Sequence, residues 1–120
     1  MRLTRQEIEE STGCDNVAEL VELNMASRYI DDLGYIAKLT KLQDVNFAFN
    51  DLRALGDGLQ RCKGLRALNV MHNQLHNLNG VQGLAALRCL RAANNRIKGL
   101  EAIAGLENLQ ELWLLSLIHI

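Results

Sequence analysis

Apolar and polar positions follow a fixed pattern along this chain, and the pattern is clearest between residues 65 and 86. Just before Asn73, two apolar residues flank one polar position, which predicts a short β-strand with one buried face. After Asn73, apolar residues recur at every third position, which predicts a 3-10 or loosely helical segment that runs back. The apolar positions of this stretch are Leu65, Leu68, Val70, Leu75, Leu78, Val81 and Leu84.

The pattern begins five times, at intervals of 22 or 23 residues. A single copy cannot bury its own apolar face, so the copies are expected to stack into an α/β solenoid. Such a stack has one continuous core and a parallel sheet along its concave side. The one extra residue of the second copy is placed in a convex-side loop at 56–58. The copies start at Leu20, Leu42, Leu65, Leu87 and Leu109, and the last of them loses the pattern after Leu114.

An asparagine stands where the chain turns away from the strand in three of the copies. Its side-chain amide is expected to bond backbone groups of the buried turn that would otherwise lack partners. The first copy has Arg28 in that place, which indicates an end repeat whose turn faces solvent on one side. The predicted structural ladder consists of Asn50, Asn73 and Asn95.

The first nineteen residues do not follow the pattern and read as an N-terminal helical cap. Thr4 and Glu7 form a capping box, which predicts a helix from about residue 5 to residue 11, ended by Gly13. Leu3 and Ile8 are expected to pack at its start. Residues 20–114 are then the repeats. The alternative for residues 1–19 is a docking helix for a partner.

Residues that point out of the predicted sheet form four stripes across successive strands. Aromatic residues and arginine most often anchor protein interfaces, so the large side chains of these stripes predict a protein-binding concave face. The other interpretation is that the alanines only allow close packing and that single exposed residues carry no function. The candidate binding residues are Asn24, Asn46, Phe49, Asn69, Met71, His72, Arg91 and Trp113. The stripes also contain Glu22, Ala26, Ser27, Asp44, Ala48, Ala67, Cys89, Ala93, Asn94 and Glu111.

The last six residues, Leu115 to Ile120, break the pattern inside the fifth strand. They resemble one reading frame through a transposon end used to prepare sequencing libraries. We therefore interpret 115–120 as a sequencing or cloning scar and expect the natural chain to continue past Leu114. The alternative is a natural apolar tail that plugs the end of the solenoid.

The repeat resembles a leucine-rich repeat, because an Asn-x-Ile/Leu-x-x-Leu run follows each strand at Asn73 and at Asn95. The 22-residue period resembles the class of protein phosphatase 1 regulatory subunits. Short matches at 1–4, 21–24 and 32–33 resemble the start of a ciliary and flagellar member, and the run from Leu109 to Trp113 resembles axonemal members. The resemblance implies a right-handed horseshoe segment with 3-10 or short helical elements on its convex side. It also implies an intracellular, non-enzymatic protein that binds phosphatase, dynein or other proteins.

Composition narrows the function further. The formal net charge is −1 and aromatic residues make up 4%, which argues against a nucleic-acid or anionic-membrane surface. The cysteines lack paired ligand spacing, and neither a transmembrane run nor a signal peptide is recognisable, so an intracellular, cytoplasmic or ciliary location is expected. His72 and His76 flank a turn rather than sharing a helix face, so metal binding is not expected. Cys62 occupies a core slot, whereas Cys89 lies on the sheet.

No nucleophile, base and orienting group assemble in this pattern, so we expect a monomer that is not an enzyme and needs no cofactor. The leading hypothesis is an interaction scaffold that holds a protein partner on its concave sheet face. One alternative is the recognition domain of a larger, truncated signalling enzyme such as a ubiquitin ligase or kinase. Another is a purely structural part of a large assembly.

Overall fold

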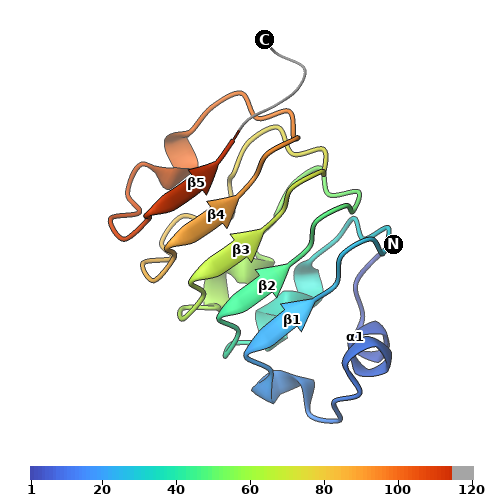
Figure 1. Ribbon diagram of the computed structural model, residues 1–120. Coiled ribbons are helices and arrows are strands. Elements are labelled where there is room, and N and C mark those ends of the chain that lie inside the picture. The colour runs from blue at the N-terminus through green and yellow to red at the C-terminus, as the bar shows by residue number, and fades with distance from the viewer. Residues whose placement is uncertain (115–120) are drawn as a thin grey trace.

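The computed structural model describes residues 1–114, and its chain winds through successive coils that place five short strands side by side (Figure 1). The strands form one parallel sheet in sequence order. They are β1 (Glu22–Asn24), β2 (Asp44–Asn46), β3 (Ala67–Asn69), β4 (Cys89–Arg91) and β5 (Glu111–Trp113). The helices are α1 (Arg5–Thr12) and the 3-10 helices η1 (Val17–Glu19), η2 (Gly34–Lys38), η3 (Gly58–Arg61) and η4 (Glu101–Ile103).

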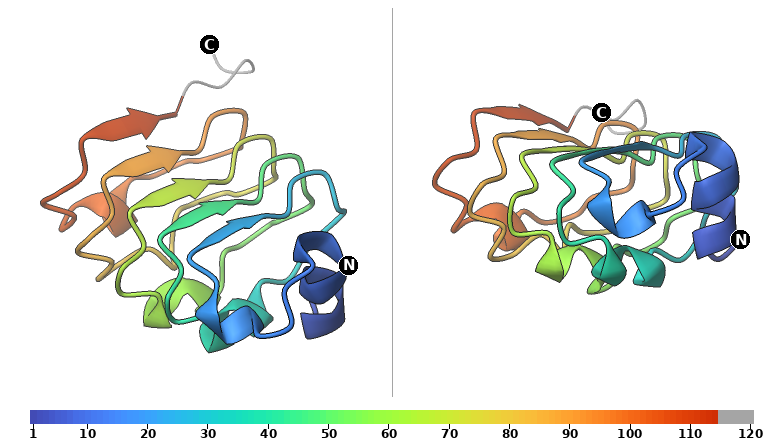
Figure 2. Two further views of the ribbon diagram at one scale, coloured as in Figure 1. Left: turned by 60° about the horizontal axis from the view of Figure 1, so that its bottom comes forward. Right: turned by 90° about the horizontal axis from the view of Figure 1, so that it is seen from below.

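Residues at equivalent positions of successive copies pair across the sheet, and the predicted solenoid is confirmed. Each strand is three residues long, and the middle residue of every strand points into the core. These middle residues are neighbours across the sheet: Leu23, Val45, Leu68, Leu90 and Leu112. The chain returns behind the sheet, and Figure 2 shows the 3-10 helices on the side of the stack opposite the strands. Between β3 and β4 the return is a series of turns without a 3-10 helix.

One apolar core runs through the whole stack, because every coil delivers its leucine-type positions to the same interior. Buried side chains extend without interruption from Leu3 to Leu106, and Phe47 is the largest of them. Cys62 occupies a core position, as predicted, and burial raises the pKa of its thiol. A solenoid of this kind has only nearest-neighbour contacts between coils, so each coil depends on the one before it and the one after it.

The N-terminal helix forms where the capping box predicts it and extends one residue further, to Thr12. The hydroxyl of Thr4 accepts a hydrogen bond from the Glu7 N–H at 3.3 Å. Gly13 ends the helix in a left-handed conformation, with φ of 70°. Leu3 and Ile8 are buried in the core beside the first coil. The function of residues 1–19 as a cover for that coil stays a prediction.

The chain leaves each of the first four strands through a residue in the left-handed region, which the sequence did not predict. These residues have φ of 58–59°, and none of them is glycine, the residue that adopts this region most easily. They are Ser27, Phe49, His72 and Asn94. The same turn therefore recurs in four coils, and it sets the direction in which the Phe49 and His72 side chains project.

Two of the stripe residues expected to point outward are buried instead. Ala48 is 4% exposed and Ala93 is 8% exposed. Both lie one residue before the left-handed turn, and a methyl group is too short to reach past its larger neighbours into solvent. The expectation that these alanines are part of the open face is wrong. The interpretation of the tail as a scar concerns residues 115–120, which lie outside the described residues.

Gly58 allows two coils to approach closely, and replacing it with alanine is expected to cost about 1–3 kcal/mol of stability, the usual penalty of overpacking. A Cβ at this position would lie 2.3 Å from the backbone oxygen of Leu33. Urea unfolding followed by circular dichroism measures the loss. Gly64→Ala is the matched control, because the nearest atom to a Cβ there is Gln43 Cγ at 4.0 Å. Equal stabilities of the two variants would contradict this close approach.

Candidate protein-binding face

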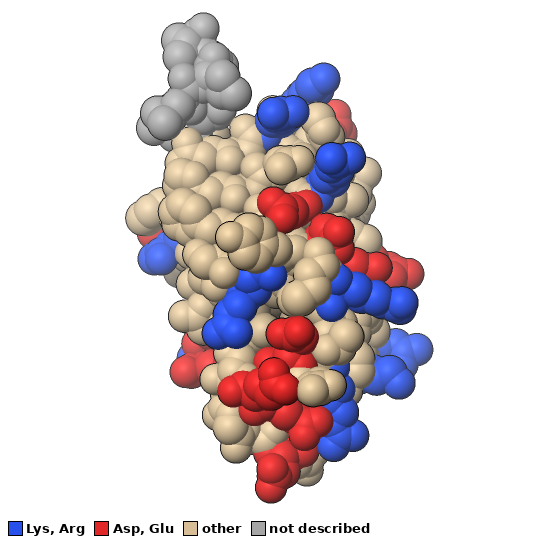
Figure 3. All heavy atoms as spheres, turned by 90° about the vertical axis from the view of Figure 1, so that its right-hand side faces the viewer, with Lys and Arg blue, Asp and Glu red and all other residues tan. Residues whose placement is uncertain are grey.

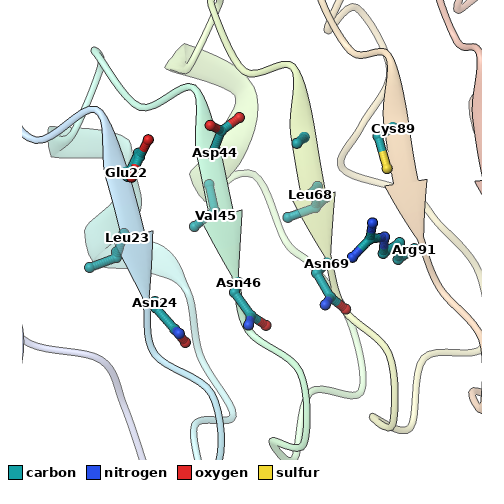
Figure 4. A pocket seen from close by; sticks show the side chains of 11 residues that line it. Glu22, Leu23, Asn24, Asp44, Val45, Asn46, Leu68, Asn69, Cys89 and Arg91 are labelled. Atoms are coloured by element: carbon teal, nitrogen blue, oxygen red, sulfur yellow. The ribbon is translucent and has the colours of Figure 1, made fainter.

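The sheet face carries a hollow of about 510 Å³ that spans β1 to β4 (Figure 4). Four of the candidate residues line it: Asn24, Asn46, Asn69 and Arg91. The other four do not. Phe49, Met71 and His72 follow the strands, and Trp113 belongs to β5. The candidate set therefore divides into a floor of polar residues and a rim that carries aromatic rings.

The hollow also contains residues that the candidate set left out, at the first position of each strand. They share the outward direction of the asparagines because side chains alternate along a strand. Strand alternation could have added these residues to the candidate binding set. Their side chains are small or acidic, however, and do not resemble interface anchors. They are Glu22, Asp44, Ala67 and Cys89. Glu22 and Asp44 lie side by side in the register of β1 and β2.

The asparagines on the floor are held in one orientation by the backbone. The side-chain oxygen of each accepts the N–H of the residue two positions later, at distances of 2.9–3.1 Å. An N–H can bond only to the oxygen of an amide, so the NH₂ group of each side chain is directed away from its own backbone. The residues are Asn24, Asn46 and Asn69.

Arg91 continues the asparagine row onto β4, and Trp113 on β5 lies against it. The guanidinium carbon is 4.6 Å from the centre of the Trp113 ring, a cation–π distance. Arg91 Nε is shielded from solvent and has no hydrogen-bond partner within the described part of the chain. Figure 4 shows this side chain reaching from β4 toward β3.

Glu111 on β5 is held by two donors. Cys89 Sγ donates to one carboxylate oxygen at 3.2 Å, and Trp113 Nε1 donates to the other at 2.8 Å. These hydrogen bonds, and the charge of Arg91, hold the pKa of Glu111 below its usual value. The pKa of Cys89 is raised, first by burial and then by the hydrogen bond and charge of Glu111. Cys89 is therefore a protonated donor at neutral pH rather than a reactive thiolate.

The rim at the ends of β2 and β3 carries a pair of stacked rings. Phe49 is 55% exposed, and its ring lies 4.2 Å from that of His72 with an interplanar angle of 9°. A ring nitrogen of His72 also meets the Asn94 amide nitrogen at 3.1 Å. The left-handed conformation of all three residues brings them into one row. The pair offers a preformed apolar platform next to the hollow.

Comparison with solved structures finds the same architecture in many chains, among them two internalins and one leucine-rich repeat domain. An internalin (inlF) from Listeria monocytogenes is 26% identical over 81% of this chain, with a TM-score of 0.75. The leucine-rich repeat domain of APL1B is 24% identical over 97%, with a TM-score of 0.73. Internalin C2 (inlC2) from Listeria monocytogenes is 23% identical over 79%, with a TM-score of 0.64.

The chain folds as a leucine-rich repeat solenoid. It spans 28%, 36% and 51% of the lengths of those three chains. No family model matches the sequence, and no curated protein matches it. The neighbours support the leucine-rich repeat architecture; the phosphatase-regulatory and ciliary expectations stay predictions.

The asparagine ladder of this leucine-rich repeat joins successive coils. The Asn50 oxygen accepts the N–H groups of Arg28 and Ile30, both at 2.9 Å, and its NH₂ group donates to Met25 O at 3.0 Å. All three partners belong to the preceding coil. Asn73 bonds the Leu52 N–H at 3.0 Å, and Asn95 bonds the Leu75 N–H at 3.0 Å. Arg28, which stands in the ladder position of the first coil, instead donates from its guanidinium to Ser11 Oγ at 2.9 Å.

A second hollow, of about 630 Å³, is lined by polar and charged residues: Asp31, Asp51, Arg53 and Gln74. On the face seen in Figure 3, basic and acidic side chains are interspersed, with acidic ones gathered toward the end that carries α1. Among residues 1–114, no group of three or more His, Cys, Asp or Glu side chains is arranged to hold a metal ion. Within the same range, no helix is both long and apolar enough to cross a bilayer.

Proposed function

We propose that this leucine-rich repeat solenoid is a non-enzymatic scaffold that binds a protein partner on its concave sheet face. The observation that carries the proposal is the hollow of about 510 Å³ across β1 to β4, floored by polar side chains and bordered by exposed rings. Aromatic residues, methionine and arginine are enriched in protein interfaces, and this face carries Phe49, Met71, Trp113 and Arg91.

The rigidity of the face also supports a binding function. Its floor is a hydrogen-bonded sheet whose middle side chains are fixed in the core. Its asparagines and Arg91 are oriented before any partner arrives. A preorganised surface loses little conformational freedom on binding, so more of the contact energy appears as affinity.

Within this function we propose the phosphatase-regulatory class, with a ciliary or axonemal setting as its narrower form, in an intracellular compartment. The support is the repeat period, the run that follows Asn73 and Asn95, and the short N-terminal matches described above. The cysteines Cys14, Cys62 and Cys89 are free thiols, which is compatible with a reducing compartment.

Replacing Phe49, Met71 and Arg91 together with alanine is expected to abolish partner capture by the immobilised protein. Truncation of one interface anchor costs about 2 kcal/mol or more, and about 1.4 kcal/mol corresponds to a tenfold change in affinity. Extracts of cells that express the chain supply the partners, and mass spectrometry quantifies what the wild type and the variant retain.

The matched control replaces Lys38, Lys63 and Glu107 with alanine, three exposed residues away from the sheet. Capture by this control is expected to equal that of the wild type, and circular dichroism verifies that both triple variants are folded. Equal capture by wild type and by a folded sheet-face variant would contradict the proposal, as would equal loss in both triple variants.

A further inference from the structure

The two ends of the hollow, taken along the axis of the solenoid, differ in charge and in hydrogen-bonding groups. At the β1 and β2 end it presents two carboxylates, Glu22 and Asp44, on neighbouring strands (Figure 4). Asp44 has a salt bridge at 3.3 Å to Arg66, which lies just outside the hollow. Glu22 has no ion pair among residues 1–114. Neighbouring like charges repel each other, so this end attracts a further cation.

The row beside the carboxylates presents only hydrogen-bond donors. The oxygens of the three floor asparagines are used by backbone N–H groups, and their NH₂ groups have no hydrogen-bond partner within the described residues. Arg91 is the neighbour of Asn69 in the register of β3 and β4 and adds a guanidinium to the same row. A row of donors without acceptors matches a ligand rich in carbonyl or carboxylate oxygens.

Arg91 is the part of this row that is best prepared for a carboxylate. The Trp113 ring holds the guanidinium in place at 4.6 Å. Nε is shielded from solvent, so the terminal NH₂ groups are the donors that can meet a partner. Glu111, on the next strand, feels the charge of Arg91 but forms no salt bridge with it among residues 1–114; its two oxygens accept hydrogen bonds from Cys89 and Trp113. A partner carboxylate would bond to the terminal NH₂ groups of Arg91 and to the NH₂ group of Asn69.

We propose that the hollow binds a linear segment of a partner protein in one charge order. A lysine or arginine of the segment lies at Glu22 and Asp44, and an aspartate or glutamate lies at Arg91 and Asn69. The reversed order would place like charges together at both ends, which excludes it. This inference rests on the proposed function and adds the chemistry of the partner to it.

The spacing of the two charges follows from the sheet. Asp44 and Arg91 are two strands apart, and Glu22 and Arg91 are three strands apart. Strands lie about 4.8 Å from their neighbours, and Arg91 stands two residues, about 6.6 Å, further along its strand than Glu22 and Asp44 do along theirs. The partner charges are therefore expected about 12–16 Å apart. An extended chain advances about 3.3 Å per residue, so the acidic and basic residues of the segment are expected about four or five positions apart.

A random twelve-residue peptide library displayed on phage tests the inference with the whole chain as bait. Enriched peptides are expected to carry one acidic and one basic residue about four or five positions apart. Arg91→Glu is expected to weaken such a peptide at least about tenfold, and a peptide with its acidic residue changed to lysine is expected to recover the affinity for that variant. Asn69→Asp keeps the size of the side chain and the backbone hydrogen bond, and it is also expected to weaken the original peptide.

The matched control is Arg88→Glu, the same charge change at an exposed position outside the hollow and just before β4. It is expected to leave peptide affinity unchanged, and thermal unfolding verifies that each variant is folded. Another outcome is that peptides bind Arg91→Glu as tightly as the wild type but bind Phe49→Ala or Met71→Ala more weakly. That result would overturn this inference and leave the proposed function in place. If no enriched peptide responds to any sheet-face variant, both are contradicted.

Discussion

Leu68→Ala is expected to lower the free energy of unfolding by about 2–5 kcal/mol, the range found when a fully buried leucine is reduced to alanine. Leu68 is 1% exposed and occupies the central strand, where it is the neighbour of Val45 on one side and Leu90 on the other. A cavity there weakens two coil interfaces at once. Since single domains are stable by about 5–15 kcal/mol, the loss is a large share of the total. Urea denaturation followed by circular dichroism measures it.

Leu112→Ala is the matched control for this central position. Leu112 has the same place in its coil, but it is only partly buried and pairs with Leu90 alone among residues 1–114. Its removal therefore empties less core volume and weakens one interface, and a clearly smaller loss is expected. Equal losses at the centre and at β5 would contradict the nearest-neighbour description of this solenoid.

The sequence predicts this fold well because one frame repeats with almost constant length. Once Leu23, Val45, Leu68 and Leu90 are assigned to the same position of successive copies, their alignment as neighbouring strands follows from the stacking of identical units. Capping chemistry is equally local, which is why Thr4 and Gly13 mark the ends of the first helix within one residue.

The candidate site was predicted less completely, because its geometry depends on contacts between coils. Strand alternation gives the side of the sheet on which Asn46 and Asp44 project, but the position of a guanidinium or a ring depends on its neighbour in the next coil. Arg91 is placed by Trp113, twenty-two residues later. The stacking of Phe49 on His72 depends on a left-handed turn without glycine, for which the sequence has no signal.

The asparagine ladder also combines a feature that is local in the sequence with contacts that form only between coils. Asn50, Asn73 and Asn95 lie in the turns after the strands, where they are buried. The spacing of residues in the sequence shows in which turn an asparagine stands, but not which groups of another coil it bonds. The hydrogen bonds of Asn50 to Arg28, Ile30 and Met25 cross to the preceding coil, so the ladder stabilises stacking as well as the turns themselves.

Asn50→Leu is expected to lower the free energy of unfolding by about 2–6 kcal/mol, because each buried backbone group left without a partner costs about 1–3 kcal/mol. The Ile30 N–H and the Met25 carbonyl are both buried, and both lose their hydrogen bond to the Asn50 side chain. Asn73→Leu is expected to cost less, about 1–3 kcal/mol. There the Leu52 N–H loses its partner, while the Phe47 carbonyl keeps a hydrogen bond from Asn50.

Urea unfolding of both ladder variants measures this order, and Asn16→Leu is the matched control. Asn16 is exposed and its side chain makes no capping hydrogen bond, so its replacement is expected to change stability by less than about 0.5 kcal/mol. A ladder that acted only within its own turn would make Asn50→Leu and Asn73→Leu equally destabilising. A larger loss at Asn50 therefore distinguishes hydrogen bonding between coils from hydrogen bonding within one coil. At Asn50 both the Ile30 N–H and the Met25 carbonyl of the preceding coil lose their hydrogen bond, whereas at Asn73 the Phe47 carbonyl keeps one from Asn50.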